Sequence, residues 1–249
     1  MKTGLLRFYK TYFLLVTLAV AVVIVKLNFF EKKSYTFSHD QLGFFIGDVS
    51  FFNNLSYDEA EDKMIALFPD KLQPKVQKVI RPVLSICEKH QVDPFWVLSV
   101  LWTESHFKHE SISRKGAKGL MQMMPETFEA TLAEMKAQGI ELESEKETKE
   151  LKEKYQAELK KFGPNKFRAK LNNLEVGIYY LKGLLAKFRG NHYYATVAYN
   201  MGPTWTSSQL KNNKPVAVKN KYLEKVLKAY YHITRTLASY PHVAYEPRR

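Results

Sequence analysis

The chain has 249 residues, 45% of them hydrophobic, which allows one medium-sized domain with a substantial core and a short appended segment. Its formal net charge of +13 favours an anionic partner, but the sequence lacks phosphate loops, zinc-finger spacings and compact basic recognition helices, so we expect no nucleic acid to bind. The only cysteine, Cys87, excludes an intramolecular disulfide.

The first predicted element is a membrane-spanning helix over residues 11–30. No charged residue occurs between Lys10 and Lys26, and the apolar character resumes after Lys26, whose amine can extend to the interface. The basic residues within 1–10 keep that end in the cytoplasm by the positive-inside rule, so the rest of the chain lies outside. A cleaved signal peptide is the alternative, but the clearest small-x-small pattern, at residues 19–21, falls inside the apolar run.

Residues 31–70 mix aromatic, polar and turn-forming residues, and we predict a juxtamembrane spacer or packing collar without assigned chemistry. Residues 71–249 are predicted to form one all-α domain, because no convincing strand alternation occurs. A first amphipathic helix over residues 74–90 is expected to kink or divide at Pro82. Cys87 lies in its apolar pattern and is predicted to be a buried thiol.

A second helix is predicted from Pro94 to about Ser105, because Asp93 suits the N-cap and proline suits the first helical position. It carries Glu104, the first ionisable residue after Asp93 in an otherwise uncharged and mostly apolar run. Burial there would raise the pKa of the carboxyl group, unless Lys108 pairs with it or the helix end faces water. A carboxyl that stays protonated near neutral pH can donate a proton to a glycosidic oxygen and later remove one.

The segment that follows, residues 113–125, contains Gly116 and Gly119, which are predicted to frame a turn before a short apolar helix. That helix would carry a single amide, Gln122. The amide can donate and accept hydrogen bonds, as an N-acetyl or hydroxyl group requires, and a buried structural glutamine is the alternative.

The carboxyl-terminal half is predicted to be helical as well. Ser144 and Glu147 form a capping box that would begin a charged amphipathic helix, which Gly163-Pro164 would stop. The further helices predicted are residues 173–188, 193–199 and 218–238.

Four ordered segments resemble the motifs of the soluble-lytic-transglycosylase family. The first two motifs are similar to residues 104–107 and 113–122, the third to residues 173–181, and the fourth to residues 198–203. The resemblance covers most of the chain from about residue 75 to residue 232, but the charged stretch between the second and third motifs is longer than expected for the family.

The resemblance implies a lysozyme-like helical catalytic domain that needs no metal or cofactor, with Glu104 as the sole acid and base. It implies that Tyr199 lines the cleft and hydrogen-bonds near this carboxyl group or the N-acetyl group of the substrate. Gln122 and Asn200 would bind sugar, and Ser105 would support a substrate contact or the orientation of Glu104.

Two further residues belong to the expected substrate-binding set. Met121 lies inside the second motif, next to the amide. Tyr222 stands where family members usually carry a tyrosine, although Val218 and Lys219 depart from the acidic and threonine residues that tend to precede it. Core packing is therefore the alternative for Tyr222.

The implied reaction cleaves the β-1,4 bond between N-acetylmuramic acid and N-acetylglucosamine in peptidoglycan and leaves 1,6-anhydromuramyl ends. Most glycosidases use two carboxylates, but Glu110, Glu126 and Glu129 have the polar surroundings of ordinary surface residues. A single carboxylate suffices if the substrate supplies the nucleophile. A hydrolytic muramidase of the goose-lysozyme type and a non-catalytic wall-binding scaffold are the alternatives.

The expected partners follow from this activity and from the predicted anchor. They are the glycan strands of peptidoglycan and the inner membrane, which residues 11–30 would cross once so that the catalytic domain lies in the periplasm. An envelope assembly that needs a local opening in the wall is a further candidate partner.

Overall fold

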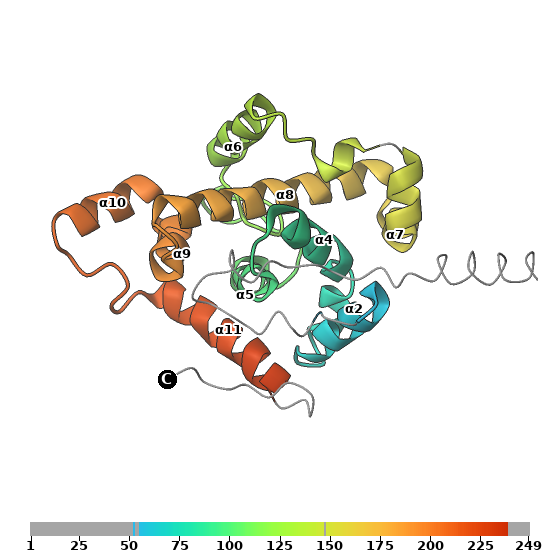
Figure 1. Ribbon diagram of the computed structural model, residues 1–249, viewed down its shortest axis with the longest axis horizontal. Coiled ribbons are helices and arrows are strands. Elements are labelled where there is room, and N and C mark those ends of the chain that lie inside the picture. Colours follow the sequence, from blue (N-terminus) through green and yellow to red (C-terminus); the bar gives the residue numbers. More distant parts are fainter. Residues whose placement is uncertain (1–51, 53–54, 147, 239–249) are drawn as a thin grey trace, which may run out of the picture. The chain divides into compact units, whose positions relative to one another are not determined.

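The computed structural model describes residues 52, 55–146 and 148–238 (Figure 1). This part of the chain confirms the predicted all-α class, since its regular elements are helices and only isolated bridges join Lys118 to Ile112 and to Met123. The helices are α2 (Tyr57–Ala66), α3 (Gln73–Val76), α4 (Ile80–His90), α5 (Pro94–Ser105), α6 (Pro125–Ala137), η3 (Glu143–Glu145), α7 (Thr148–Phe162), α8 (Pro164–Lys187), α9 (His192–Met201), α10 (Pro203–Lys211) and α11 (Lys221–Ala238).

The predicted cytoplasmic segment 1–10 and the predicted anchor 11–30 lie outside the described residues. Within the described ranges, no helix combines the length and the hydrophobicity needed to cross a bilayer. The predicted spacer 31–70 contains helix α2, which was not predicted. Ser56 begins α2 with a capping box, because its side chain and that of Glu59 each bond the other's backbone N–H.

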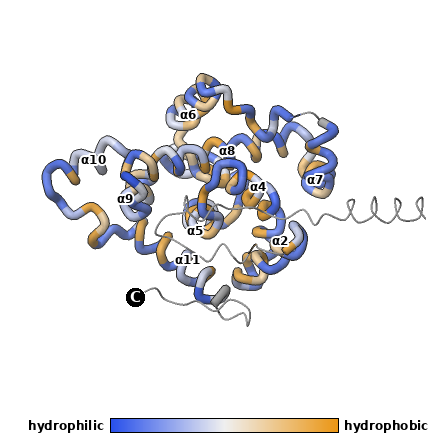
Figure 2. The backbone as a smooth tube through the Cα atoms, in the orientation of Figure 1, coloured by the Kyte–Doolittle hydropathy of each residue, from blue (hydrophilic) through white to orange (hydrophobic). Residues whose placement is uncertain are grey.

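Helix α5 forms the centre of the domain and is packed against α4 and α11 (Figure 1). Its side chains from Phe95 to Leu101 are buried, and in Figure 2 the hydrophobic colouring gathers where α4 and α5 meet. A helix that is apolar all round belongs in the core of a domain. Both predicted ends are confirmed, and Asp93 caps the helix by accepting a hydrogen bond from the Phe95 N–H at 2.8 Å.

The predicted helix over residues 74–90 is divided, but not at Pro82. The helix is interrupted between α3, which ends at Val76, and α4, which begins at Ile80, so Pro82 lies in the first turn of α4. A proline is tolerated there because the first backbone N–H groups of a helix have no partner within it.

The prediction for the charged helix was wrong at its start. Ser144 is buried inside η3, Glu147 lies outside the described residues, and α7 begins at Thr148. Gly163 ends α7 as predicted, but Pro164 then starts α8, which is longer than the predicted helix 173–188. Proline suits the first position of α8 for the same reason that it suits the start of α5.

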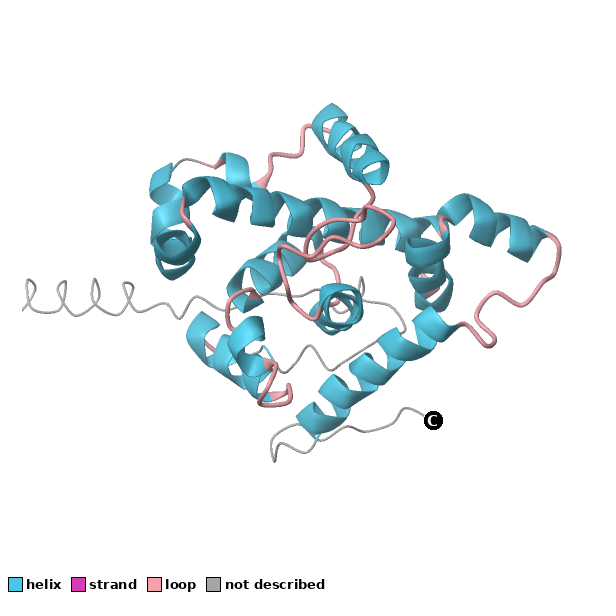
Figure 3. Cartoon of the chain, turned by 180° about the vertical axis from the view of Figure 1, so that it is seen from behind, coloured by secondary structure: helices cyan, strands magenta, loops and turns pink. Residues whose placement is uncertain are grey.

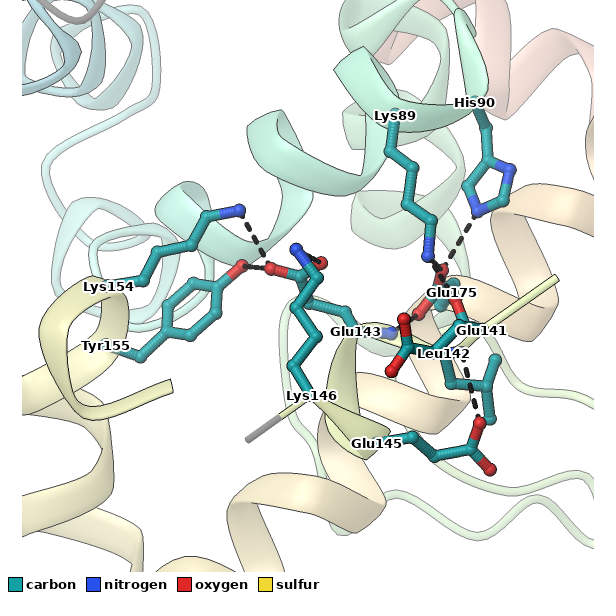
Figure 4. A network of polar contacts seen from close by, with 10 residues as sticks. All are labelled: Lys89, His90, Glu141, Leu142, Glu143, Glu145, Lys146, Lys154, Tyr155 and Glu175. Atoms are coloured by element: carbon teal, nitrogen blue, oxygen red, sulfur yellow. Dashed lines mark hydrogen bonds and ion pairs between the residues drawn. The ribbon is translucent and has the colours of Figure 1, made fainter. Parts of the chain in front are cut away.

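A buried polar cluster joins α4, η3 and α8 (Figure 4). The fully buried carboxylate of Glu175 accepts hydrogen bonds from Lys89 Nζ at 2.6 Å, from His90 Nε2 at 3.1 Å and from the Glu143 backbone N–H at 2.6 Å. Burial alone would raise the pKa of Glu175, but His90 and Lys89 outweigh it and hold the pKa below its usual value.

The carboxylate of Glu143 extends this cluster to α7 (Figure 4). It accepts hydrogen bonds from Lys154 Nζ at 2.8 Å and from the Tyr155 hydroxyl at 3.1 Å, while Lys146 lies 3.1 Å away. The cluster therefore attaches the segment before and within α7 to the hydrophobic core.

Candidate functional site

Glu104 is the second-last residue of α5, immediately before the helix ends in a left-handed cap at His106. Its carboxyl group is half-buried and accepts a hydrogen bond on Oε1 from the Tyr222 hydroxyl at 2.6 Å. Burial raises the pKa of Glu104 to about 6, while the Tyr222 bond acts in the opposite direction. The carboxyl is therefore poised to exchange a proton close to neutral pH. Among the described residues, neither Lys108 nor a second carboxylate forms a hydrogen bond or ion pair with it.

Tyr222 reaches Glu104 because α11 packs along α5. The side chain of Asn220 caps α11 by accepting hydrogen bonds from the N–H groups of Tyr222 at 3.1 Å and Leu223 at 2.9 Å, so the helix begins later than the predicted Val218. Burial and the nearby Glu104 carboxylate raise the pKa of the Tyr222 phenol well above its usual value. The phenol thus keeps its proton and acts as the donor.

Tyr199, on α9, is the second tyrosine near the carboxyl group. Its hydroxyl donates to the backbone carbonyl of Met121 at 2.7 Å, and its ring packs against Tyr180 with centroids 5.7 Å apart. Burial raises its pKa, and the negative charge of Glu104 adds to this effect, which places the phenol within electrostatic range of Glu104. In this structure Tyr222, rather than Tyr199, donates to the carboxyl group.

The segment between α5 and α6 is a long loop (Figure 3), and it reaches the site through the Met121 carbonyl, which accepts the hydrogen bond from Tyr199. The predicted short helix in it is wrong: residues 119–122 form a tight turn, closed by a reciprocal pair of backbone hydrogen bonds between Lys118 and Met123 at 2.9 and 3.1 Å. Gly116 and Gly119 do not frame a single turn as predicted, because one turn at residues 114–115 precedes Gly116 and the next begins at Gly119. The first turn is closed by a hydrogen bond from the Gly116 N–H to the Ser113 carbonyl at 3.0 Å, and the Ala117 N–H donates to the Ser113 hydroxyl at 3.0 Å.

Gln122 adopts a left-handed conformation with φ 46° at the end of this turn. Its side-chain N–H groups donate to the carbonyls of Ser111 at 2.9 Å and Gly119 at 2.8 Å. Both donors hold the loop together, which agrees with the structural alternative for this glutamine. Sugar binding by Gln122 stays a prediction. Because both side-chain N–H groups are occupied, the side-chain carbonyl oxygen would have to make the contact.

Asn173 on α8 holds the loop from outside. Its Oδ1 accepts a hydrogen bond from the Met121 N–H at 3.0 Å, and its Nδ2 donates to the Lys118 carbonyl at 3.1 Å. Gly119 has φ 79°, and a Cβ there would lie 2.5 Å from Asn173 Cγ. The turn therefore depends on the hydrogen bonds with Asn173, and Asn173 fits only because residue 119 is a glycine. In the sequence, only the position of Asn173 in the third motif could have indicated this role.

Gly177, one turn further along α8, allows Met121 to approach the helix. A Cβ at this position would lie 2.6 Å from Met121 Cγ and 2.7 Å from Met121 Cβ. Met121 is fully buried, so its side chain packs on α8 while its carbonyl binds Tyr199.

The remaining predicted residues lie at the ends of their helices. Ser105 is buried, and its hydroxyl donates to the Leu101 carbonyl at 3.2 Å within its own helix. Asn200 is exposed near the end of α9, one residue after Tyr199. Substrate contacts by Ser105 and Asn200 stay predictions.

Comparison with known proteins identifies a family. Residues 82–152 and 145–222 match the model of the transglycosylase SLT domain, and together they make up more than half of the chain. Among solved structures, an inactive mutant of the lytic transglycosylase Slt from Pseudomonas aeruginosa is similar at 23% identity and a TM-score of 0.39. That match covers 63% of this chain and 22% of the Pseudomonas aeruginosa chain.

Proposed function

Because the chain belongs to the transglycosylase SLT domain family, we propose that it is a peptidoglycan lytic transglycosylase with Glu104 as its only catalytic acid and base. The observation that carries the proposal is the half-buried carboxyl group of Glu104, whose pKa of about 6 lets it exist in both protonation states near neutral pH. One tyrosine hydroxyl orients this group, and no second carboxylate of the described residues is in contact with it.

In the first step, the protonated Glu104 gives its proton to the oxygen between N-acetylmuramic acid and N-acetylglucosamine as the bond from C1 of the muramyl sugar breaks. Tyr222 donates to Oε1, which leaves Oε2 to carry the transferred proton. The carbonyl oxygen of the muramyl N-acetyl group stabilises the positive charge that develops at C1.

In the second step, the Glu104 carboxylate removes the proton of the muramyl 6-hydroxyl, and the oxygen bonds to C1. The product is a 1,6-anhydromuramyl end, no water is consumed, and the carboxyl group is protonated again for the next cycle. A lone acid and base suits this reaction because the substrate provides both the stabilising group and the nucleophile.

The setting of the reaction is a further part of the proposal. The uncharged residues 11–25 and the apolar residues that follow Lys26 support a single-pass anchor over residues 11–30 in the inner membrane, with the catalytic domain in the periplasm, where it would act on nearby glycan strands.

The decisive experiment digests purified glycan strands with the full-length protein and weighs the fragments. We expect anhydromuramyl ends from the wild type and a loss of rate of about 10²–10⁴-fold or more for Glu104→Gln, since that is the usual contribution of a general acid. Glu126→Gln, an exposed carboxylate on α6, is the matched control and should cleave normally.

Three results would contradict the proposal. Products heavier by one water would show a muramidase of the goose-lysozyme type instead. Equal cleavage by the wild type and Glu104→Gln would remove Glu104 from the reaction, and inactivity of all three proteins on intact sacculi and on purified strands would favour a wall-binding scaffold.

A further inference from the structure

A pocket of about 590 Å³ opens between α6, α8 and the loop that follows α5. Neither Glu104 nor the tyrosines near it line this pocket; its residues include His109, Lys118, Leu120, Phe128, Lys166 and Lys170. Its size lies within the range of about 300–1,000 Å³ that is typical of small-ligand sites. The pocket is thus a second candidate site, on the other side of the loop that carries Met121.

The lining combines an apolar floor with charged groups of both signs. Leu120 and Met123 are buried in the floor, whereas Ile112 is 71% exposed at the edge. The exposed carboxylates of Glu110 and Glu129 also line the pocket. Such a lining suits an amphipathic ligand that carries an amine as well as an anionic group.

Lys170 is the residue that points to an anionic ligand. Its side chain is 6% exposed, its amine donates to the Lys78 carbonyl, and the nitrogen lies 4.4 Å from the centre of the Phe162 ring. Burial lowers the pKa of Lys170 to about 8. In residues 55–146 and 148–238 no carboxylate forms an ion pair with Lys170, although the negative charge of Glu158 raises its pKa against the effect of burial. A negative ligand group would supply the ion pair that this buried cation lacks.

The electrostatics of His109 show that the same region is positive. Its pKa is lowered mainly by burial, Glu110 opposes this, and Lys170, Lys166 and Lys78 lower it further. A negative ligand group in the pocket would therefore interact favourably with several cations at once.

From these contacts we propose that the pocket binds the carboxylate end of a short peptide, with the carboxylate on Lys170 and Lys166 and a small apolar side chain against Leu120. Because the proposed substrate is peptidoglycan, the occupant would be its stem peptide, and this identification rests on the proposed function. The amine of such a peptide would lie near the carboxylates of Glu110 and Glu129. A simple fatty acid has no amine, so it would leave these two carboxylates without a partner.

The pocket and the site of Glu104 share one loop. Lys118 and Gly119 line the pocket, while the next residues place the Met121 carbonyl on Tyr199. Asn173 also lines the pocket and holds both sides of the turn. A bound peptide would therefore contact the segment that shapes the catalytic site.

The test measures binding of the free tetrapeptide L-alanyl-D-isoglutamyl-meso-diaminopimelyl-D-alanine to the full-length protein by isothermal titration calorimetry, without glycan. We expect Lys170→Met to weaken binding about tenfold, because a hydrogen bond between charged groups is lost. Lys166→Ala should weaken it about threefold, because this lysine is exposed. The same peptide with amidated carboxyl groups should bind to the wild type more weakly than the free peptide binds to Lys170→Met, because amidation removes the partner of both lysines.

Lys182→Met, an exposed lysine further along α8, is the matched control and should bind like the wild type. The proposal is overturned if the wild type does not bind the peptide, if all variants bind it equally, or if octanoate binds more tightly than the peptide. Since Lys166 is exposed, its variant keeps the test decisive even if Lys170→Met fails to fold. The assay needs no cleavage, so binding without lytic activity would refute the proposed function alone, and lytic activity without binding would refute this inference alone.

Discussion

The hydrogen bond from Tyr222 to Glu104 determines at which pH the proposed enzyme should lose activity. In Tyr222→Phe the ring stays, but the hydroxyl that lies 2.6 Å from Glu104 Oε1 is gone. This bond favours the ionised carboxylate, whereas burial, the larger effect, favours the neutral acid. Without the bond the pKa of Glu104 must rise above its present value of about 6.

The size of this rise follows from the energy of the lost bond. A hydrogen bond to a charged group contributes about 1.5–3 kcal/mol, and each pKa unit corresponds to about 1.4 kcal/mol. The pKa of Glu104 should therefore increase by about one to two units. Since the first step needs the protonated form, activity falls as the pH rises through this pKa, and the fall should move from about pH 6 to a pH between about 7 and 8.

The assay records kcat/KM on purified glycan strands between pH 4.5 and about pH 9, together with an NMR titration of the labelled Glu104 carboxyl carbon. Tyr231→Phe, an exposed tyrosine of the same helix, should leave the profile unchanged. The reasoning is refuted if the fall in Tyr222→Phe stays in place or moves to lower pH while the protein remains folded.

Three predictions concern the stability of the fold and are measured by urea unfolding. Gly177→Ala should destabilise the protein by about 1–3 kcal/mol, because the new methyl group collides with Met121. The control Gly183→Ala, which has open space around it, should stabilise the protein by up to about 1 kcal/mol. Equal effects of the two substitutions would contradict this explanation. Burial raises the pKa of Asp93 to about 7, so the free energy of unfolding of the wild type should decrease as the pH rises from about 4 to 7. Over the same pH range the free energy of unfolding of Asp93→Asn should decrease by about 2–4 kcal/mol less, because this side chain does not ionise. Parallel pH curves for the two proteins would contradict this explanation. Glu175→Gln should destabilise by about 3 kcal/mol, since it leaves cations without their carboxylate, and an unchanged midpoint would show that the cluster contributes nothing.

The sequence by itself determined α5 and the place of Glu104 on it. Asp93 and Pro94 act on the first turn of the helix, and the uncharged run up to Glu104 requires burial, so these signals are local and need no knowledge of the rest of the chain. The same is true of the family motifs, whose order along the chain indicated the transglycosylase SLT domain.

Only the tertiary structure decided which groups surround the carboxyl group. Tyr222 is 118 residues from Glu104, and the packing of α11 along α5, rather than any periodicity, brings the two together. The loop that carries Gln122 looked helical by composition, but Asn173 holds it as a turn and its own amide closes it. Such contacts depend on how distant helices cross, and the pattern of apolar residues along one helix does not specify the side chains that another helix presents to it.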